Sequence, residues 1–243
     1  MRRFFVLFGR ELKATFDSFG FFLLLAIVMG ITGFTFQNLL QGTGGEMDFA
    51  LRGLQSWLFW LTIVLTPLLT MRLFAEEKRS GSFELLMTAP VSDAQVVLAK
   101  YFSSALIFAT FMLPLWVLHA LLALFFDAEP DWGQLCATSI GLLGLAIVFL
   151  AVGLFASAVS SQQLWAGILA LIGNMVLMAL GTLQSFFDAG STFSRFFRYI
   201  NLSEHLGTAL GGVIDFRQTL VQVSLTCLIL FWTIRSVEVR KWR

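Results

Sequence analysis

Six long apolar runs constrain the fold of this chain more than any other feature of the sequence. They cover residues 19–40, 56–71, 101–126, 135–159, 164–183 and 220–237. About 20 apolar residues in a helix cross the roughly 30 Å hydrocarbon core of a bilayer. Inside lipid, only helices and closed barrels satisfy every backbone polar group, and runs of this length favour helices. The sequence therefore predicts an all-α membrane protein, with six transmembrane helices in a single domain over residues 1–243.

Composition excludes several other classes of protein. With 58% hydrophobic and 13% charged residues, the chain has too little polar surface to cover a soluble globule of its size. It has no long basic tract that would follow a nucleic acid. It also has no HExxH motif, Cys/His cluster, G-x-S-x-G elbow or Walker A loop. We therefore expect no catalytic residue, metal or cofactor in this chain.

Lysine and arginine residues are distributed unequally between the two sides of the predicted bundle. Six spans place both termini on one side, together with the 72–100 loop. Twelve of the sixteen lysine and arginine residues lie on that side. Because short cytoplasmic loops carry an excess of positive charge, we expect the termini and the 72–100 loop to be cytoplasmic.

Two further segments are predicted to lie at the membrane boundary. Residues 1–18 place phenylalanine and leucine on one helical face and most charges on the other, which is typical of an interfacial helix; a frayed tail is the alternative. Residues 184–218 mix aromatic residues with Arg195 and Arg198. These residues are too polar to cross the bilayer and too apolar to lie in water, so we expect an outer re-entrant segment. An ordinary interfacial loop is the alternative.

The 72–100 loop is a charged island between the second and third spans. Transfer of charged side chains into hydrocarbon is unfavourable in free energy, so Glu76, Glu77 and Arg79 mark where the second span ends. Gly81 is expected to break the helix there. Ser82 then caps a short helix over residues 83–88, with Glu84 in its first turn, and Pro90 ends it. A capping box in residues 92–95 starts the next helix at about residue 93. The pattern predicts a short amphipathic helix held crosswise between two spans.

Four residues within the spans are candidates for a transport pathway or for gating: Asn174, His119, Pro67 and Pro114. Polar groups at membrane depth often face the bundle interior or water. Hydrogen bonding between helices is the alternative for Asn174. The two prolines are expected to kink their helices, as hinges or merely as packing features.

The charged island also resembles a known motif. The sequence from Glu76 to Leu86, followed by Pro90-Val91-Ser92 and Lys100, is similar to the cytoplasmic motif of type-2 ABC exporter permeases, especially the gliding-motility and nitrous-oxide-maturation branch. The stretches 212–217 and 235–242 look like the end of the same branch, although Gly211 stands where a basic residue is expected.

This resemblance implies a half-transporter of the bacterial inner membrane. Two permease chains pair as a homodimer or heterodimer, and each docks on an ABC ATP-binding subunit that holds ATP and Mg. Residues 1–18 would be a connecting helix and residues 81–89 the coupling helix. The resemblance implies an ATPase interface formed by Glu76, Glu77, Arg79, Gly81, Ser82, Phe83, Glu84, Leu85, Met87 and Pro90.

Two readings of the function remain open at the level of sequence. One is an exporter; because no span carries a charge in its middle, an ion-driven carrier is disfavoured and a lipid-like or amphipathic cargo is favoured. The other is a mechanical or scaffolding subunit that drives a periplasmic accessory protein, or a motility or secretion partner, while nothing passes through the bundle.

Overall fold

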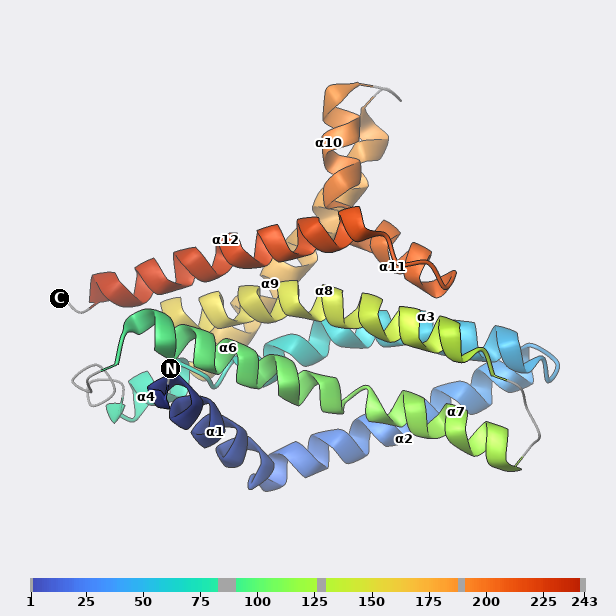
Figure 1. Ribbon diagram of the computed structural model, residues 1–243, viewed down its shortest axis with the longest axis horizontal. Helices are drawn as coiled ribbons and strands as arrows, with labels where there is room; N and C mark the ends of the chain where they lie inside the picture. The colour runs from blue at the N-terminus through green and yellow to red at the C-terminus, as the bar shows by residue number, and fades with distance from the viewer. Residues whose placement is uncertain (1, 83–90, 126–129, 188–190, 241–243) are drawn as a thin grey trace.

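The structure is a computed structural model of the chain and describes residues 2–82, 91–125, 130–187 and 191–240. Within these residues all regular secondary structure is helical (Figure 1). The predicted all-α class is therefore confirmed for the described part of the chain.

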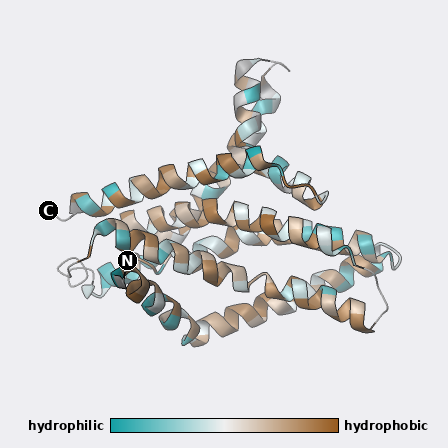
Figure 2. Ribbon diagram, in the orientation of Figure 1, coloured by the Kyte–Doolittle hydropathy of each residue, from teal (hydrophilic) through white to brown (hydrophobic). Residues whose placement is uncertain are grey.

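Six helical segments are long and apolar enough to cross a membrane, as the sequence predicted. They are α2 (Phe19–Gly42), α3 (Met47–Thr70), α6 (Asp93–Thr110) together with α7 (Leu113–Phe125), α8 (Trp132–Val159), α9 (Gln163–Thr182) and α12 (Phe216–Arg240). Both termini lie at the same end of the bundle, at the left of Figure 1, beside the short helix α4 (Ala75–Arg79). We call this the terminal end and the opposite one the distal end. Figure 2 shows that apolar residues dominate the long helices between them.

Helix α8 is the centre of the bundle. It packs against α3, α6, α9 and α12, and its leucine and phenylalanine side chains include several of the most deeply buried in the described chain. Small residues allow its neighbours to come close. A Cβ atom on Gly153 would lie 2.0 Å from Thr70 Oγ1 of α3, and one on Gly173 of α9 would lie 2.6 Å from Val152. Helix contacts in membranes depend on such small residues, because lipid gives no hydrophobic drive for association.

Helix α1 (Arg2–Phe16) shows the separation of faces expected from the sequence, and its partner is now defined. Phe4, Phe8, Leu12 and Phe16 are partly buried, whereas Arg3, Arg10, Lys13 and Asp17 are exposed. The helix packs along α6 and leads into α2 (Figure 1). The apolar face of the predicted interfacial helix thus covers a membrane-spanning helix of the same chain.

The second and third spans differ from the prediction for identifiable reasons. Helix α3 begins nine residues before the predicted residue 56, because Ala50, Leu51 and Leu54 are buried in the bundle and hold that stretch helical. The third span is broken at residues 111–112 rather than kinked. Pro114 lies in the first turn of α7, and since proline has no N–H to donate, the preceding helix ends at Thr110, four residues earlier.

The described residues of the segment predicted as re-entrant form three short helices, one of them over 202–210, where the sequence indicated a short helix. They are the 3₁₀ helix η1 (Leu183–Phe186), α10 (Thr192–Ile200) and α11 (Leu202–Leu210). In Figure 1, α10 stands away from the bundle, whereas α11 lies along the distal half of α8. Asn201 caps α11 by accepting hydrogen bonds from the backbone of Ser203 and Glu204. The side chain of Gln134 in α8 donates to the carbonyl of Leu210 at 2.8 Å, which ties α11 to the bundle.

Candidate functional site: the junction at the terminal end

Helix α4 is too short to be stable alone, and side chains from other helices hold it in place. Ser157, near the end of α8, accepts hydrogen bonds from the backbone N–H groups of Phe74 and Ala75 at 3.0 and 3.1 Å. These are N–H groups that the first turn of a helix leaves without partners. The Ser157 hydroxyl also donates to the carbonyl of Met71 at 3.3 Å. One side chain of α8 therefore fixes both the end of α3 and the start of α4.

Lys78 makes the reciprocal contact from α4 to α8. Its ammonium group donates to the carbonyls of Ser157 and Ser160 at 3.4 and 3.1 Å and to that of Ala158. The last carbonyls of a helix have no partners within it, and its C-terminus favours a cation. Helices α4 and α8 thus cap one another.

A charge cluster on the other side of α4 joins three helices. Lys100 of α6, whose side chain is only 3% exposed, lies 2.8 Å from the carboxylate of Glu77 in α4 and 3.1 Å from that of Glu11 in α1. Arg10 completes the cluster, 2.7 Å from Glu11 and 3.4 Å from Glu77. The Lys100 ammonium also lies 5.3 Å from the centre of the Phe74 ring. The cluster therefore links α4 to α1 and α6.

The cluster keeps Glu11 ionised. Burial alone raises the pKa of this carboxyl, but the charge of Lys100 and the hydrogen bonds from Arg10 and Lys100 outweigh it. The net pKa of Glu11 lies below its ordinary value of 4.5. The hydrogen bond to Glu11 correspondingly raises the pKa of Arg10. A buried ion pair of this kind adds little stability by itself, but removing one partner is costly because the other charge stays buried.

The other described residues of the predicted ATPase interface lie on the outward face of α4 or directly after the helix. Glu76 and Arg79 form an ion pair of 3.5 Å on this face, and the Arg79 side chain is 70% exposed. Gly81 follows with a φ of 76°, a conformation that L side chains rarely adopt. Ser82 is exposed and its hydroxyl lies 2.9 Å from that of Ser80. Among the predicted interface residues that the structure describes, Glu77 is the one that turns inward to the charge cluster.

The remaining predicted interface residues, Phe83, Glu84, Leu85, Met87 and Pro90, lie outside the described residues. The chain is described again from Val91, where the predicted capping box is present: Ser92 accepts from the backbone of Gln95, and the Gln95 side chain accepts from the backbone of Ser92. Helix α6 starts at Asp93, as the sequence predicted.

Two of the four predicted pathway residues lie together. Pro67, inside α3, cannot donate to the carbonyl of Ile63 four residues earlier. Asn174 of α9 is fully buried, and its side-chain nitrogen donates to that carbonyl at 3.3 Å and to the Thr66 hydroxyl at 3.1 Å. The interhelical hydrogen bond considered for Asn174 is therefore present, and it replaces a backbone bond that Pro67 removes.

The other two pathway residues lie in the distal part of the third span. Pro114 stands at the break between α6 and α7. His119 is buried in α7, with Nδ1 2.8 Å from the carbonyl of Leu115 in its own helix. Among the described residues no group of three or more His, Cys, Asp or Glu residues could hold a metal ion.

Sequence reasoning missed Glu11 and Ser157 and treated Lys100 as part of an aqueous loop. A signal for Lys100 was nonetheless present. On a helix that starts at Asp93, it lies on the same face as Val96, Val97 and Ile107, which are buried. A lysine on an apolar helix face needs an acidic partner, although the sequence alone cannot say which.

Comparison with known proteins identifies the family of the chain. A search of curated proteins found no match. Residues 38–234, which include α3, the junction helix α4 and α8, match the family model described as ABC-2 family transporter protein. Since this match covers most of a chain that has six apolar helices, the chain belongs to the ABC-2 transporter family and is the transmembrane component of an ABC transporter.

Proposed function

We propose that the chain is the permease subunit of an ATP-driven exporter, and that the junction at the terminal end carries motion from an ATP-binding subunit into the bundle. The observation that carries this proposal is that α4 is attached to the bundle on one face and exposed on the other. One face of the helix is tied to α1, α6 and α8 by buried hydrogen bonds and ion pairs, while the other face exposes Glu76 and Arg79.

In this proposal the arrangement transmits displacement. If a partner moves α4, the contacts of Ser157 and Lys78 displace the end of α8, and the contacts of Glu77 displace α6 and α1. Because α8 packs against four other spans, its movement rearranges the bundle between two packed states. A partner that binds one state more tightly shifts their populations.

The orientation of the chain in the membrane and its partner subunits follow from this function. The terminal end faces the cytoplasm, as the excess of lysine and arginine there favours, and the partner subunit binds ATP and Mg. Two copies of the chain, or this chain and a related one, form the membrane part. The stretch from Glu76 to Leu86 favours the gliding-motility and nitrous-oxide-maturation branch of these permeases, in the inner membrane of a bacterium.

The test compares two ion pairs of the same kind at the terminal end. Glu76 and Arg79 form an i,i+3 pair on α4, and Arg235 and Glu238 form an i,i+3 pair on α12. We expect Arg79→Glu to lower the ATP hydrolysis of the complex with its ATPase, or the amount of ATPase that copurifies. Arg235→Glu, the matched control, should leave both near the wild-type level, and both variants should insert normally in the membrane. Equal loss in both variants, or no loss in either, would contradict the assignment of α4.

A further inference from the structure

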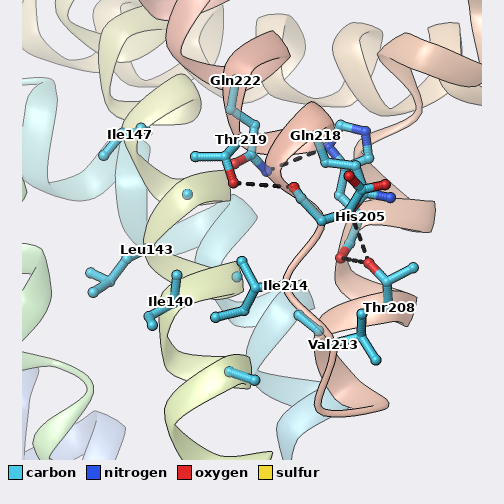
Figure 3. Close-up of a pocket in the computed structure, with 15 residues that line it drawn as sticks. Ile140, Leu143, Ile147, His205, Thr208, Val213, Ile214, Gln218, Thr219 and Gln222 are labelled. Atoms are coloured by element: carbon cyan, nitrogen blue, oxygen red, sulfur yellow. Dashed lines mark hydrogen bonds between the residues drawn. The ribbon is translucent and has the colours of Figure 1, made fainter.

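A groove on the distal half of the bundle is lined by apolar side chains of α8 and of the α11–α12 connection, with polar side chains of α11 and α12 beside them (Figure 3). Its volume is about 260 Å³, larger than the roughly 150 Å³ engineered cavity that accommodates benzene. Ile140, Leu143 and Ile147 of α8 form one side, and Val213 and Ile214 of the α11–α12 connection form the other. Ile140, Val213 and Ile214 are about half exposed or more, so the groove opens on the surface of the bundle and not into its interior.

The floor of this groove is preformed. A Cβ atom on Gly141 would lie 2.5 Å from Ala209 of α11, and one on Gly144 would lie 2.3 Å from the Gln222 side chain of α12. These two glycines of α8 therefore allow α11 and α12 to pack tightly on it. The Thr208 hydroxyl of α11 donates to Gln218 of α12 at 2.8 Å, which joins the two helices. Ligand sites are usually preformed in this manner.

A polar chamber of about 400 Å³ adjoins the apolar groove and shares His205, Asp215 and Gln218 with it. Arg195, Arg217, Glu204 and Asp215 line the chamber, so it presents two positive and two negative groups. Arg217 is positioned by Tyr199: its guanidinium lies 5.4 Å from the ring centre and donates to the phenol oxygen at 3.3 Å. Burial lowers the pKa of His205, which keeps this side chain neutral and leaves the four charged groups to set the balance.

The depth of the two compartments follows from the helices that form them. Asp215 directly precedes α12 and Arg217 is its second residue, where that span must meet the water–lipid boundary, because charged residues avoid the hydrocarbon. The wall residues of α8 lie further along a span, at hydrocarbon depth. A ligand that fills both compartments therefore has an apolar chain and a polar head at the interface.

We propose that the groove and chamber bind one zwitterionic phospholipid from the distal leaflet. One of its two acyl chains lies along α8 between Ile140 and Ile147. Its phosphate accepts hydrogen bonds from the arginines, and its amine faces the carboxylates of Asp215 and Glu204. The equal number of positive and negative groups favours a head that carries both signs over an anionic head. This inference does not depend on coupling to ATP.

The test uses the full chain, purified in dodecyl maltoside and delipidated. Native mass spectrometry counts bound phosphatidylethanolamine or phosphatidylglycerol, and the melting temperature is measured with each lipid and with inorganic phosphate. We expect one phosphatidylethanolamine per chain, a rise in melting temperature greater than phosphatidylglycerol gives, and no effect of phosphate. Arg217→Glu should weaken lipid binding by roughly ten- to a hundredfold, the loss expected for a charge-assisted hydrogen bond. Ile214→Trp, which narrows the groove without touching the head chamber's arginines, should also weaken it.

Two control variants separate this site from the general lipid surface. Arg52→Glu changes an exposed arginine of α3 near the distal end, and Leu124→Trp enlarges an exposed leucine of α7. Both should bind phosphatidylethanolamine as the wild type does. Equal loss in the control and groove variants would overturn the proposal, as would equal stabilisation by all lipids. A preference for phosphatidylglycerol, or an equal effect of inorganic phosphate, would show an anion site and would also overturn it.

Discussion

Lys100 offers the sharpest test of the junction, because it is the buried cation between two carboxylates. Replacing it with methionine keeps an unbranched side chain that is one atom shorter and removes the charge. Glu11 and Glu77 then share only Arg10, whose side chain is 53% exposed. Breaking a buried ion pair by removing one partner costs about 3–5 kcal/mol, and the lower end applies here because both carboxylates keep some exposure.

A loss of about 3 kcal/mol corresponds to a fall in melting temperature of roughly 6–12 °C for a chain of this size. The measurement is the monodisperse fraction of the detergent-solubilised protein after heating, followed by size exclusion with fluorescence detection. Arg79→Met is the control, because it removes an exposed cation of α4 and should change stability by about 0.5 kcal/mol or less. The triple variant K100M/E11Q/E77Q should regain most of the loss, since it leaves no buried charge unpaired.

The pH dependence of stability gives an independent check, because protonation of Glu11 should destabilise the wild type and relieve the Lys100→Met variant. In the wild type the pKa of Glu11 is lowered, so its contribution is present above about pH 4.5 and is lost as the pH falls through the folded-state pKa. In Lys100→Met, burial is no longer outweighed by Lys100, and we expect the pKa of Glu11 to rise. The deficit of this variant should then shrink as the pH is lowered from about 7 to 5. This account of the cluster would be refuted if Lys100→Met had the melting temperature of the wild type. It would also be refuted if the triple variant had a melting temperature no higher than that of Lys100→Met.

Two further predictions concern packing between the spans. Asn174→Leu leaves a buried carbonyl without a donor and should cost about 1–3 kcal/mol, but much less in a Pro67→Ala background, where the restored N–H satisfies that carbonyl. A double-mutant cycle on melting temperatures measures this coupling, and strictly additive effects would argue against it. Gly153→Ala should destabilise the protein by about 1–3 kcal/mol because the new Cβ would overlap Thr70. Gly30→Ala, with no atom within 4 Å of the added Cβ, should be neutral or slightly stabilising in the same assay.

The long-range pattern of the chain could be predicted because it follows from local composition. Each span is marked by a run of apolar residues that lipid requires to be helical, and no tertiary contact is needed to find it. The start of α6 at Asp93 was predictable for the same reason, since Ser92 and Gln95 make a capping box within one turn. The likeness of the charged island to ABC exporter permeases also depends on adjacent residues.

The junction could not be predicted, because its residues are far apart in the sequence. Glu11 and Glu77 meet at Lys100 only because α1 packs along α6, and α4 is capped by Ser157 only because α8 ends beside it. The hydrogen bond from Asn174 to the Ile63 carbonyl, which Pro67 leaves without a donor, likewise requires α9 to cross α3 beside Ile63. Neither hydropathy nor spacing carries this information.

The sequence by itself thus determined which segments are helices in lipid and where charge collects, since both depend on transfer of each residue between water and hydrocarbon. Only the tertiary structure decided which charges are paired and buried, which helix ends cap one another, and where an apolar groove meets a polar chamber. These features depend on contacts between helices, and many residue patterns with the same hydropathy could have packed differently.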